Sequence, residues 1–250
     1  NHFFTKQFHV YARLPFYREE EEEEDNEEIL SRFESDYWFD HNWIFGMHKN
    51  CFYTLPFHYD YLHECHGTFN DMKSTMNQIF TNNHHIWFNI QTIELNHMAK
   101  YDQHFFYQLN HKMPKLKFIK FTNSWLDFDG HLNDDPTKQI FNYVTTIQFD
   151  GIPMEDRQDW LIHQISNLKH LILSSIHLPS TNNQLTQILN QRIQRLDIDQ
   201  HSRIDELINT TYIYFSNVQY INFRLYENRS YQYYAHCVMQ ILKIEGGLRC

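Results

Sequence analysis

One hydrophobic pattern, apolar-x-x-apolar-x-apolar, occurs six times in the last two thirds of this chain. The first positions of successive copies, residues 90, 116, 144, 168, 193 and 218, are 26, 28, 24, 25 and 25 residues apart. The copies are Ile90/Ile93/Leu95, Leu116/Ile119/Phe121, Val144/Ile147/Phe149, Leu168/Leu171/Leu173, Ile193/Leu196/Ile198 and Val218/Ile221/Phe223. A period in this range is typical of stacked supersecondary units, because one unit cannot bury its apolar face alone. The pattern therefore predicts one elongated array of repeats.

The segments between the copies change to helical periodicity. Leu185, Ile188 and Leu189 predict a helix before the fifth copy, and further helices are expected after residue 135, over 202–215 and over 230–242. Parallel neighbouring strands need a crossover connection, which a helix can supply. We therefore predict an α/β leucine-rich-repeat solenoid, a horseshoe with parallel strands on its concave side and helices on its convex side.

Residues 1–80 are less regular than residues 81–250, and we assign them to a separate region. Segments 5–10 and 52–57 look like degenerate copies of the repeat strand. Between them, residues 19–28 hold nine acids. Their mutual repulsion favours a solvated insertion that is dispensable for folding. An aromatic cap is expected from Phe33, Tyr37, Trp38, Phe39, Trp43, Ile44 and Phe45. The solenoid of residues 81–250 is expected to end in mid-repeat, because residues 245–250 match the last positions of a further strand.

The charge distribution argues against a nucleic-acid partner. The net charge is −10, but the nine acids of residues 19–28 leave 22 of the 31 acids against 21 lysines and arginines. The rest of the chain is nearly neutral and lacks a basic stripe that could neutralise phosphates. No run of 18 apolar residues predicts a membrane span, and the first residues lack a signal-peptide pattern. Four cysteines at unrelated spacings favour reduced thiols and a cytoplasmic or nuclear location.

Catalytic and metal-binding patterns are also missing from the sequence. It contains no G-x-S-x-G, no catalytic-cysteine signature and no H-E-x-x-H, and its six glycines form no phosphate loop. His63, Cys65 and His66 lie close together, but a second pair of ligands at zinc spacing does not accompany them. Asp197 and Asp199 are more simply two outward residues of one strand than an acid/base pair. We therefore predict no enzyme activity, no cofactor and no metal.

The predicted sheet offers a binding surface instead. The fourth and sixth positions of the pattern point into the core, so the third, fifth and seventh project from the opposite face. Leu171 is therefore expected in the core and Ile172 on the surface. Phe118, Ile172, Arg195, Tyr220 and Arg224 are the expected anchors, because aromatic residues and arginine concentrate binding energy. Loops above the strands or the aromatic cap are the alternative binding sites. The expected protein-binding residues are Thr92, Glu94, Phe118, Lys120, Thr146, Gln148, His170, Ile172, Arg195, Asp197, Tyr220, Asn222 and Arg224.

Two of the repeats resemble a known protein family. Residues 113–121, Met-Pro-Lys-Leu-Lys-Phe-Ile-Lys-Phe, and 165–173, Ile-Ser-Asn-Leu-Lys-His-Leu-Ile-Leu, are similar to the strands of the leucine-rich-repeat arms of F-box-type proteins. The N-terminal part resembles the same group at residues 11–16, at Arg32-Phe33, from Trp38 to Trp43 and at Leu55-Pro56. The resemblance covers nearly the whole chain.

The resemblance implies a role in ubiquitin-dependent protein degradation. In that family an N-terminal F-box docks on the adaptor of a cullin-type ubiquitin ligase, and the repeat arm holds the substrate protein. This sequence contains no F-box, which on this hypothesis would lie upstream of Asn1. Two functional hypotheses follow: a substrate-recognition arm of such a ligase, or a stand-alone leucine-rich-repeat scaffold with no link to a ligase.

Overall fold

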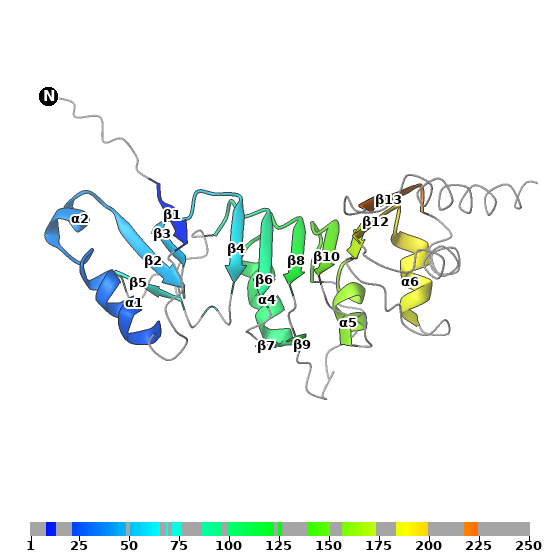
Figure 1. Ribbon diagram of the computed structural model, residues 1–250, viewed down its shortest axis with the longest axis horizontal. Coiled ribbons are helices and arrows are strands. Elements are labelled where there is room, and N and C mark those ends of the chain that lie inside the picture. Colours follow the sequence, from blue (N-terminus) through cyan, green and yellow to red (C-terminus); the bar gives the residue numbers. More distant parts are fainter. Residues whose placement is uncertain are drawn as a thin grey trace, which may run out of the picture. The chain divides into compact units, whose positions relative to one another are not determined.

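The computed structural model shows a mixed α/β fold with a parallel sheet (Figure 1). It describes residues 9–13, 22–48, 51–65, 69, 72–76, 87–96, 100–122, 125–126, 140–150, 157–173, 184–199 and 218–224. The chain divides into two compact units, residues 1–116 with 127–129 and residues 117–126 with 130–250. The division expected at residue 80 stays a prediction. Strand β6 (Thr92–Asn96) pairs in parallel with β4 (Tyr61–Cys65), and both lie in the first unit.

The first unit contains a four-stranded antiparallel sheet. Its order is β1-β3-β2-β5, formed by β1 (Tyr11–Arg13), β3 (Cys51–Leu55), β2 (Ile44–His48) and β5 (Lys73–Ser74). The expectation that residues 52–57 repeat the parallel strand is therefore wrong. β3 starts three residues after β2 ends, which is too short for a parallel crossover. Of the other expected degenerate strand, residues 5–8 lie outside the described part of the chain.

Gly46 allows the closest approach in this antiparallel sheet. It lies opposite Tyr53 in the register of β2 and β3. A Cβ atom at residue 46 would overlap the aromatic ring of Tyr53 and lie 3.1 Å from a methyl carbon of Leu55. Tyr53 is completely buried, so its ring has little room to move away. The core can therefore pack this closely only because residue 46 is a glycine.

Most of the acidic segment, predicted as a solvated insertion, is helical in the structure, and Glu27 and Glu28 are exposed on it. Helix α1 spans Glu22–Ser31, so only residues 19–21 of the segment lie outside the described part. The end of α1 carries two apolar residues, Ile29 and Leu30, which pack against the core of the unit. Glu27 forms a 2.7 Å ion pair with Lys73, and Glu28 forms one of 2.6 Å with Arg32. Acids near a helix N-terminus are also favoured by the helix dipole.

The predicted aromatic cluster is confirmed beside α1 and α2 (Asp36–Asp40). The Phe33 ring lies 4.6 Å from Phe45 and 4.9 Å from Phe52, measured between ring centroids. Trp38 stacks on Trp43 at 5.3 Å. Two members of the expected cap do not join this core, since Tyr37 and Phe39 are exposed on α2.

The remaining elements of the first unit are β4, β6, β7 (Lys100–Tyr101) and α4 (Gln103–Lys112). Asp102 caps α4, because its carboxylate accepts a 2.7 Å hydrogen bond from the backbone N–H of Phe105. His111 and Lys112 occupy the last turn, where the helix dipole favours positive charge. Phe105, Phe106 and Leu109 are buried, which fixes the side of α4 that faces the core.

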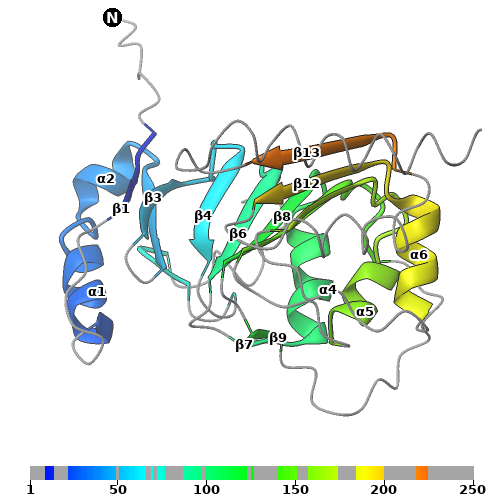
Figure 2. The same ribbon diagram turned by 45° about the vertical axis from the view of Figure 1, so that its right-hand side comes forward.

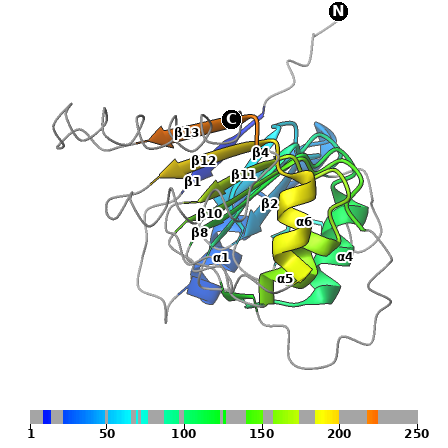
Figure 3. The ribbon, with the colours of Figure 1, turned by 90° about the vertical axis from the view of Figure 1, so that its right-hand side faces the viewer.

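The second unit contains five parallel strands in the order β13-β12-β11-β10-β8. They are β8 (Phe118–Thr122), β10 (Thr146–Asp150), β11 (His170–Leu173), β12 (Arg195–Asp199) and β13 (Tyr220–Arg224), and β9 (Trp125–Leu126) is a short further strand. Helices α5 (Arg157–His163) and α6 (Gln184–Arg192) lie on one side of these strands (Figures 2 and 3). All six expected strands and the helix expected around residues 185–189 are confirmed. The helices expected over 202–215 and 230–242 lie outside the described residues. The helix expected after residue 135 does not extend over residues 140–143, which are not helical.

The same backbone hydrogen bonds recur where four of these strands begin. Two consecutive N–H groups donate to one carbonyl oxygen just before the preceding strand, at 2.8–3.1 Å. The acceptors are the carbonyls of Lys117, Thr145, Lys169 and Gln194, which are 28, 24 and 25 residues apart. The period of the hydrophobic pattern is therefore also a period of backbone geometry.

The pattern residues form the core, as predicted. In the first five copies every pattern residue has at most 2% of its surface exposed. β8 and β10 alternate between buried and half-buried residues, the period of two expected when one face of a sheet is covered. Among the helices that the structure describes, none is long and apolar enough to cross a lipid bilayer.

Candidate functional site

The outward side chains of the second unit form two rows across the parallel strands. We call these rows the ladder face. The strand register aligns residue with residue, and neighbouring strands in a sheet lie about 4.8 Å apart. The first row is Phe118, Thr146, His170, Arg195 and Tyr220. The second row is Lys120, Gln148, Ile172, Asp197 and Asn222. The structure thus brings together ten of the expected binding residues.

Two ladder residues expected at the surface are buried. Ile172 is 5% exposed, and Asp197 has no exposed surface. Both lie in the second row, where each has a neighbour on both sides in the register. Ile172 lies between Gln148 and Asp197, and Arg195 folds along its own strand onto Asp197. Alternation gives the side of the sheet on which a residue lies, but its neighbours decide whether it reaches solvent.

Asp197 is the centre of a charged cluster. Arg195 donates two hydrogen bonds to its carboxylate, from Nε to Oδ1 at 2.9 Å and from Nη2 to Oδ2 at 3.0 Å. Nε2 of His170 lies 3.4 Å from Oδ2. Burial raises the pKa of Asp197. The hydrogen bonds and charge of Arg195, the nearby His170 and a hydrogen bond from Asn222 lower it by more, so the pKa of Asp197 is lowered overall. Asp197 is therefore ionised at neutral pH and the pKa of Arg195 is raised by its bond to this carboxylate.

A second charged group lies at the β8–β10 end of the ladder face. Nζ of Lys120 is 3.4 Å from Oδ2 of Asp150, and the Gln148 amide donates a 2.8 Å hydrogen bond to Oδ1 of the same carboxylate. Both partners of this ion pair are about one-quarter exposed. The ladder face therefore presents ion pairs as well as the exposed rings and amides of its rows.

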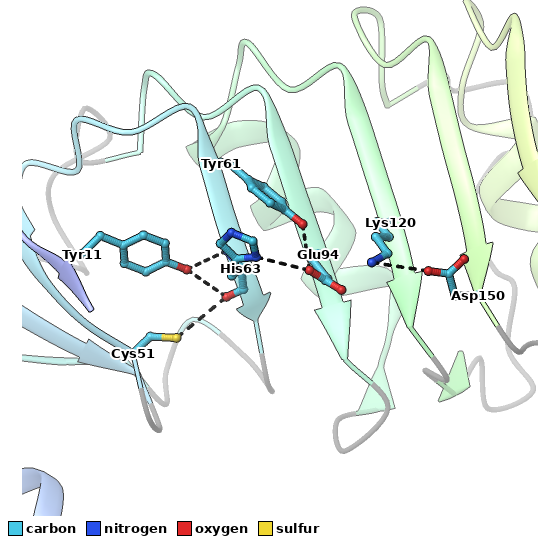
Figure 4. Close-up of polar contacts among 7 residues, drawn as sticks. All are labelled: Tyr11, Cys51, Tyr61, His63, Glu94, Lys120 and Asp150. Carbon is cyan, nitrogen blue, oxygen red and sulfur yellow. Dashed lines mark hydrogen bonds and ion pairs between the residues drawn. The ribbon is translucent and has the colours of Figure 1, made fainter. Parts of the chain in front are cut away.

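Glu94, the expected binding residue of β6, is buried in the first unit at 8% exposure. Its carboxylate accepts a 2.8 Å hydrogen bond from the Tyr61 hydroxyl and lies 3.5 Å from Nδ1 of His63 (Figure 4). The ring of His63 lies 3.8 Å from that of Tyr61, between centroids. Thr92, the other expected residue of β6, is half-buried. Glu94 is thus a buried, hydrogen-bonded carboxylate rather than an open contact residue.

Sequence analysis did not identify Tyr61 and His63 as part of this cluster. They lie on β4, which pairs in parallel with β6 but is interrupted by a shift in register between Leu62 and Cys65. The shift places Cys65 opposite Leu95, so β4 does not show the apolar-x-x-apolar-x-apolar spacing. The sequence signal that could have indicated β4 is a set of apolar residues three positions apart, Tyr59, Leu62 and Cys65.

Cys51 and Tyr11 contact the backbone of His63 beside this cluster. The thiol of Cys51, a buried cysteine, donates to the backbone carbonyl of His63 at 3.9 Å. The hydroxyl of Tyr11 accepts from the backbone N–H of His63 at 2.7 Å (Figure 4). Burial, followed by the nearby Cys51, raises the pKa of Tyr11 far above its usual range, so this phenol stays protonated. These contacts link β1, β3 and β4.

Arg224 is the last of the expected protein-binding residues. Arg224 lies in β13, but its side chain is outside the described part of the chain. Within the described residues, three or more His, Cys, Asp or Glu side chains do not gather into a group that could hold a metal ion. The arrangement as a whole can bind by aromatic contact, ion pairing and hydrogen bonding.

No protein-family model, curated protein or solved structure matches this chain.

Proposed function

We propose that this chain is a protein-binding leucine-rich-repeat module that catalyses no reaction, and that the ladder face is its contact surface. The observation that carries the proposal is the recurrence of one backbone hydrogen-bond pattern at the period of the hydrophobic repeat. Stacked units of this kind build an extended surface on which one partner can touch several repeats. The proposed architecture is a horseshoe with the ladder face on its concave side.

The composition of the first row supports the choice of this surface. Tyr220 is 68% exposed and the Arg195 side chain 50%, and the row also contains Phe118 and His170. Tyrosine and arginine are the residue types on which binding energy concentrates in protein interfaces. The row places them on neighbouring strands of a hydrogen-bonded sheet, so little backbone ordering is needed when a partner binds.

The proposed biological role is substrate recognition for an F-box-type ubiquitin ligase, in the cytoplasm or nucleus. Its support is the resemblance of residues 113–121 and 165–173 to the repeat strands of that family. In this role the ladder face holds the substrate protein, and an F-box upstream of Asn1 recruits the adaptor and the cullin. A stand-alone interaction scaffold is the second candidate, favoured by the lack of an F-box pattern within the 250 residues.

A capture experiment tests the contact surface. The purified chain is immobilised, incubated with cell extract and washed, and the retained proteins are quantified by mass spectrometry. The variant Phe118→Ala/Arg195→Ala/Tyr220→Ala should lose the retained partner while keeping the circular-dichroism spectrum of the parent. Tyr143→Ala is the matched control, because Tyr143 is 67% exposed but lies outside the strands.

Each outcome separates the candidates. Loss of a partner from the triple variant, with retention by Tyr143→Ala, supports the ladder face. Equal retention by all forms would exclude it and direct attention to the exposed aromatic residues of α2. When the same capture uses the full-length native protein, recovery of a cullin adaptor supports the ligase role. Consistent failure to recover the adaptor leaves the scaffold.

A further inference from the structure

Asp197 holds Arg195 in one position on the ladder face. The guanidinium bonds to both carboxylate oxygens, through Nε at 2.9 Å and Nη2 at 3.0 Å. The Asp197 side chain has no exposed surface, whereas that of Arg195 is 50% exposed. A guanidinium has five N–H donors in a rigid planar fork, so two bonds to Asp197 leave three donors for a further acceptor. Arg195 is thus an ordered and accessible hydrogen-bond donor.

The neighbours of Arg195 in the first row complete a mixed subsite. The register places His170 on one side and Tyr220 on the other. The Tyr220 side of this subsite is open, because Tyr220 is 68% exposed, and His170 is half-buried with its Nε2 atom 3.4 Å from Asp197. The subsite therefore combines a fixed cationic fork with an aromatic surface.

We propose that Arg195 binds the carboxylate of an aspartate or glutamate side chain of the partner protein, next to an apolar residue that contacts Tyr220. The inference rests on the proposed protein-binding function of the ladder face and adds the chemistry of the partner. A carboxylate matches the planar fork of arginine, which makes such bonds strong and directional. Because Asp197 already fixes the side chain, binding costs little rotamer entropy.

The charge of the cluster favours a carboxylate over a phosphate group. Arg195 and Asp197 together carry no net charge, and the lysine of the second row, Lys120, lies 3.4 Å from Asp150. A phosphorylated side chain brings a charge of about −1.5 to −2 and binds best to clusters of uncompensated arginines. A single negative charge needs less compensation, while it still gains the two directional bonds.

Peptide selection on the full chain tests the inference. A library of random 12-residue peptides is displayed and selected on the immobilised protein, and the enriched peptides are tested against Phe118→Ala/Tyr220→Ala to find those that need the ladder face. We expect these peptides to share an aspartate or glutamate at one position. Replacing that acid by its amide should weaken binding to the parent protein roughly tenfold or more, the usual effect of losing a charged hydrogen-bond partner.

A second variant tests whether Arg195 is the residue that binds the acid of the peptide. Arg195→Gln/Asp197→Asn keeps the shape of the pair and leaves no buried charge unpaired, so the fold should survive. Against this variant the acid and amide peptides should bind within about twofold of each other. Arg195→Lys, which keeps the charge without the fork, is the alternative if the double variant does not fold, and it should reduce the acid preference several-fold.

The outcomes distinguish this inference from the proposed function. If ladder-dependent peptides show no common acid, or if the acid preference survives in Arg195→Gln/Asp197→Asn, the inference is wrong while the binding face stands. Tighter binding of a phosphoserine peptide than of its glutamate counterpart would overturn the choice of carboxylate. Failure to find any peptide that needs the ladder face would remove the proposed function itself.

Discussion

The guanidinium of Arg195 donates two hydrogen bonds to the carboxylate of Asp197, two residues further along the same strand. Residues at i and i+2 of a strand share one face, so a long side chain can fold along the strand onto its neighbour. The contact converts what the sequence presents as two separate surface charges into one buried acid and one ordered arginine. Stability and recognition are both expected to depend on it.

The lowered pKa of Asp197 predicts a specific loss of stability in acid. Burial opposes ionisation, but the bonds with Arg195 and the proximity of His170 outweigh it, so the pKa is lower in the folded than in the unfolded chain. The ionised group therefore adds stability above its unfolded pKa of about 3.9, and this contribution is lost as the pH falls through the folded pKa. Urea unfolding between pH 7 and 2.5 should show a shallower acid dependence for Asp197→Asn than for the parent.

Asp60→Asn is the control for this measurement, because Asp60 is exposed and only its backbone carbonyl takes part in the sheet. Its acid dependence should match that of the parent protein. Equal slopes for Asp197→Asn and the parent would show that the ion pair with Arg195 does not form in solution.

Tyr61 is predicted to stabilise the first unit through one hydrogen bond. Its hydroxyl donates to Glu94, whose surface is only 8% exposed. Tyr61→Phe removes the donor and leaves the ring, so the buried carboxylate loses a partner at a cost of about 1–3 kcal/mol in the free energy of unfolding. Chemical denaturation at pH 7 measures the difference. Tyr143→Phe, at an exposed position, should change the free energy little, and an equal effect of both substitutions would contradict the Tyr61–Glu94 bond.

The parallel strands could be predicted because their signal is local and repeated. The fourth and sixth positions of each copy must be apolar to fill the core, and residues such as Ile119, Leu171 and Leu196 are completely buried in the structure. A spacing of 24–28 residues leaves room for a crossover in every repeat, and that fixes the parallel direction. Both constraints are visible in a single sequence.

The errors arose where structure depends on distant neighbours. β3 has strand-forming residues, but its antiparallel pairing follows from the short connection to β2 and from its contact with β1. Helix α1 is held by Leu30, which packs against Phe45 and Met47 far along the chain. Glu94 is placed correctly on its strand, yet its carboxylate is bonded by Tyr61 of β4, a strand that lacks the repeat spacing. Composition and alternation contain none of these contacts.

The burial of Ile172 changes the expected effect of its substitution. The outward position predicted a small cost, but at 5% exposure Ile172 is a core residue of the ladder face. Leu171→Ala should cost about 2–5 kcal/mol, and Ile172→Ala should now fall in the same range. Lys169→Ala, at an exposed position before the strand, should be nearly neutral. Guanidinium unfolding compares the three. A cost for Ile172→Ala close to that of Lys169→Ala would mean that this side chain faces solvent after all.

We predict that the acidic segment stabilises the protein by forming helix α1, and that its negative charges contribute little. Deleting residues 19–28 removes positions 22–28, seven of the ten residues of α1, and frees Leu30 from the cluster of Phe45, Met47 and Phe52. The melting temperature should therefore fall, and Leu30→Ala alone should cost about 2–5 kcal/mol. Replacing Glu22, Glu23 and Glu24 by glutamine keeps the helix propensity and removes three like charges. The relief of their repulsion offsets the loss of their favourable interaction with the helix dipole, so the melting temperature should change little. Thermal unfolding followed by circular dichroism compares the three variants, and an unchanged melting temperature after the deletion would show that α1 does not support the core.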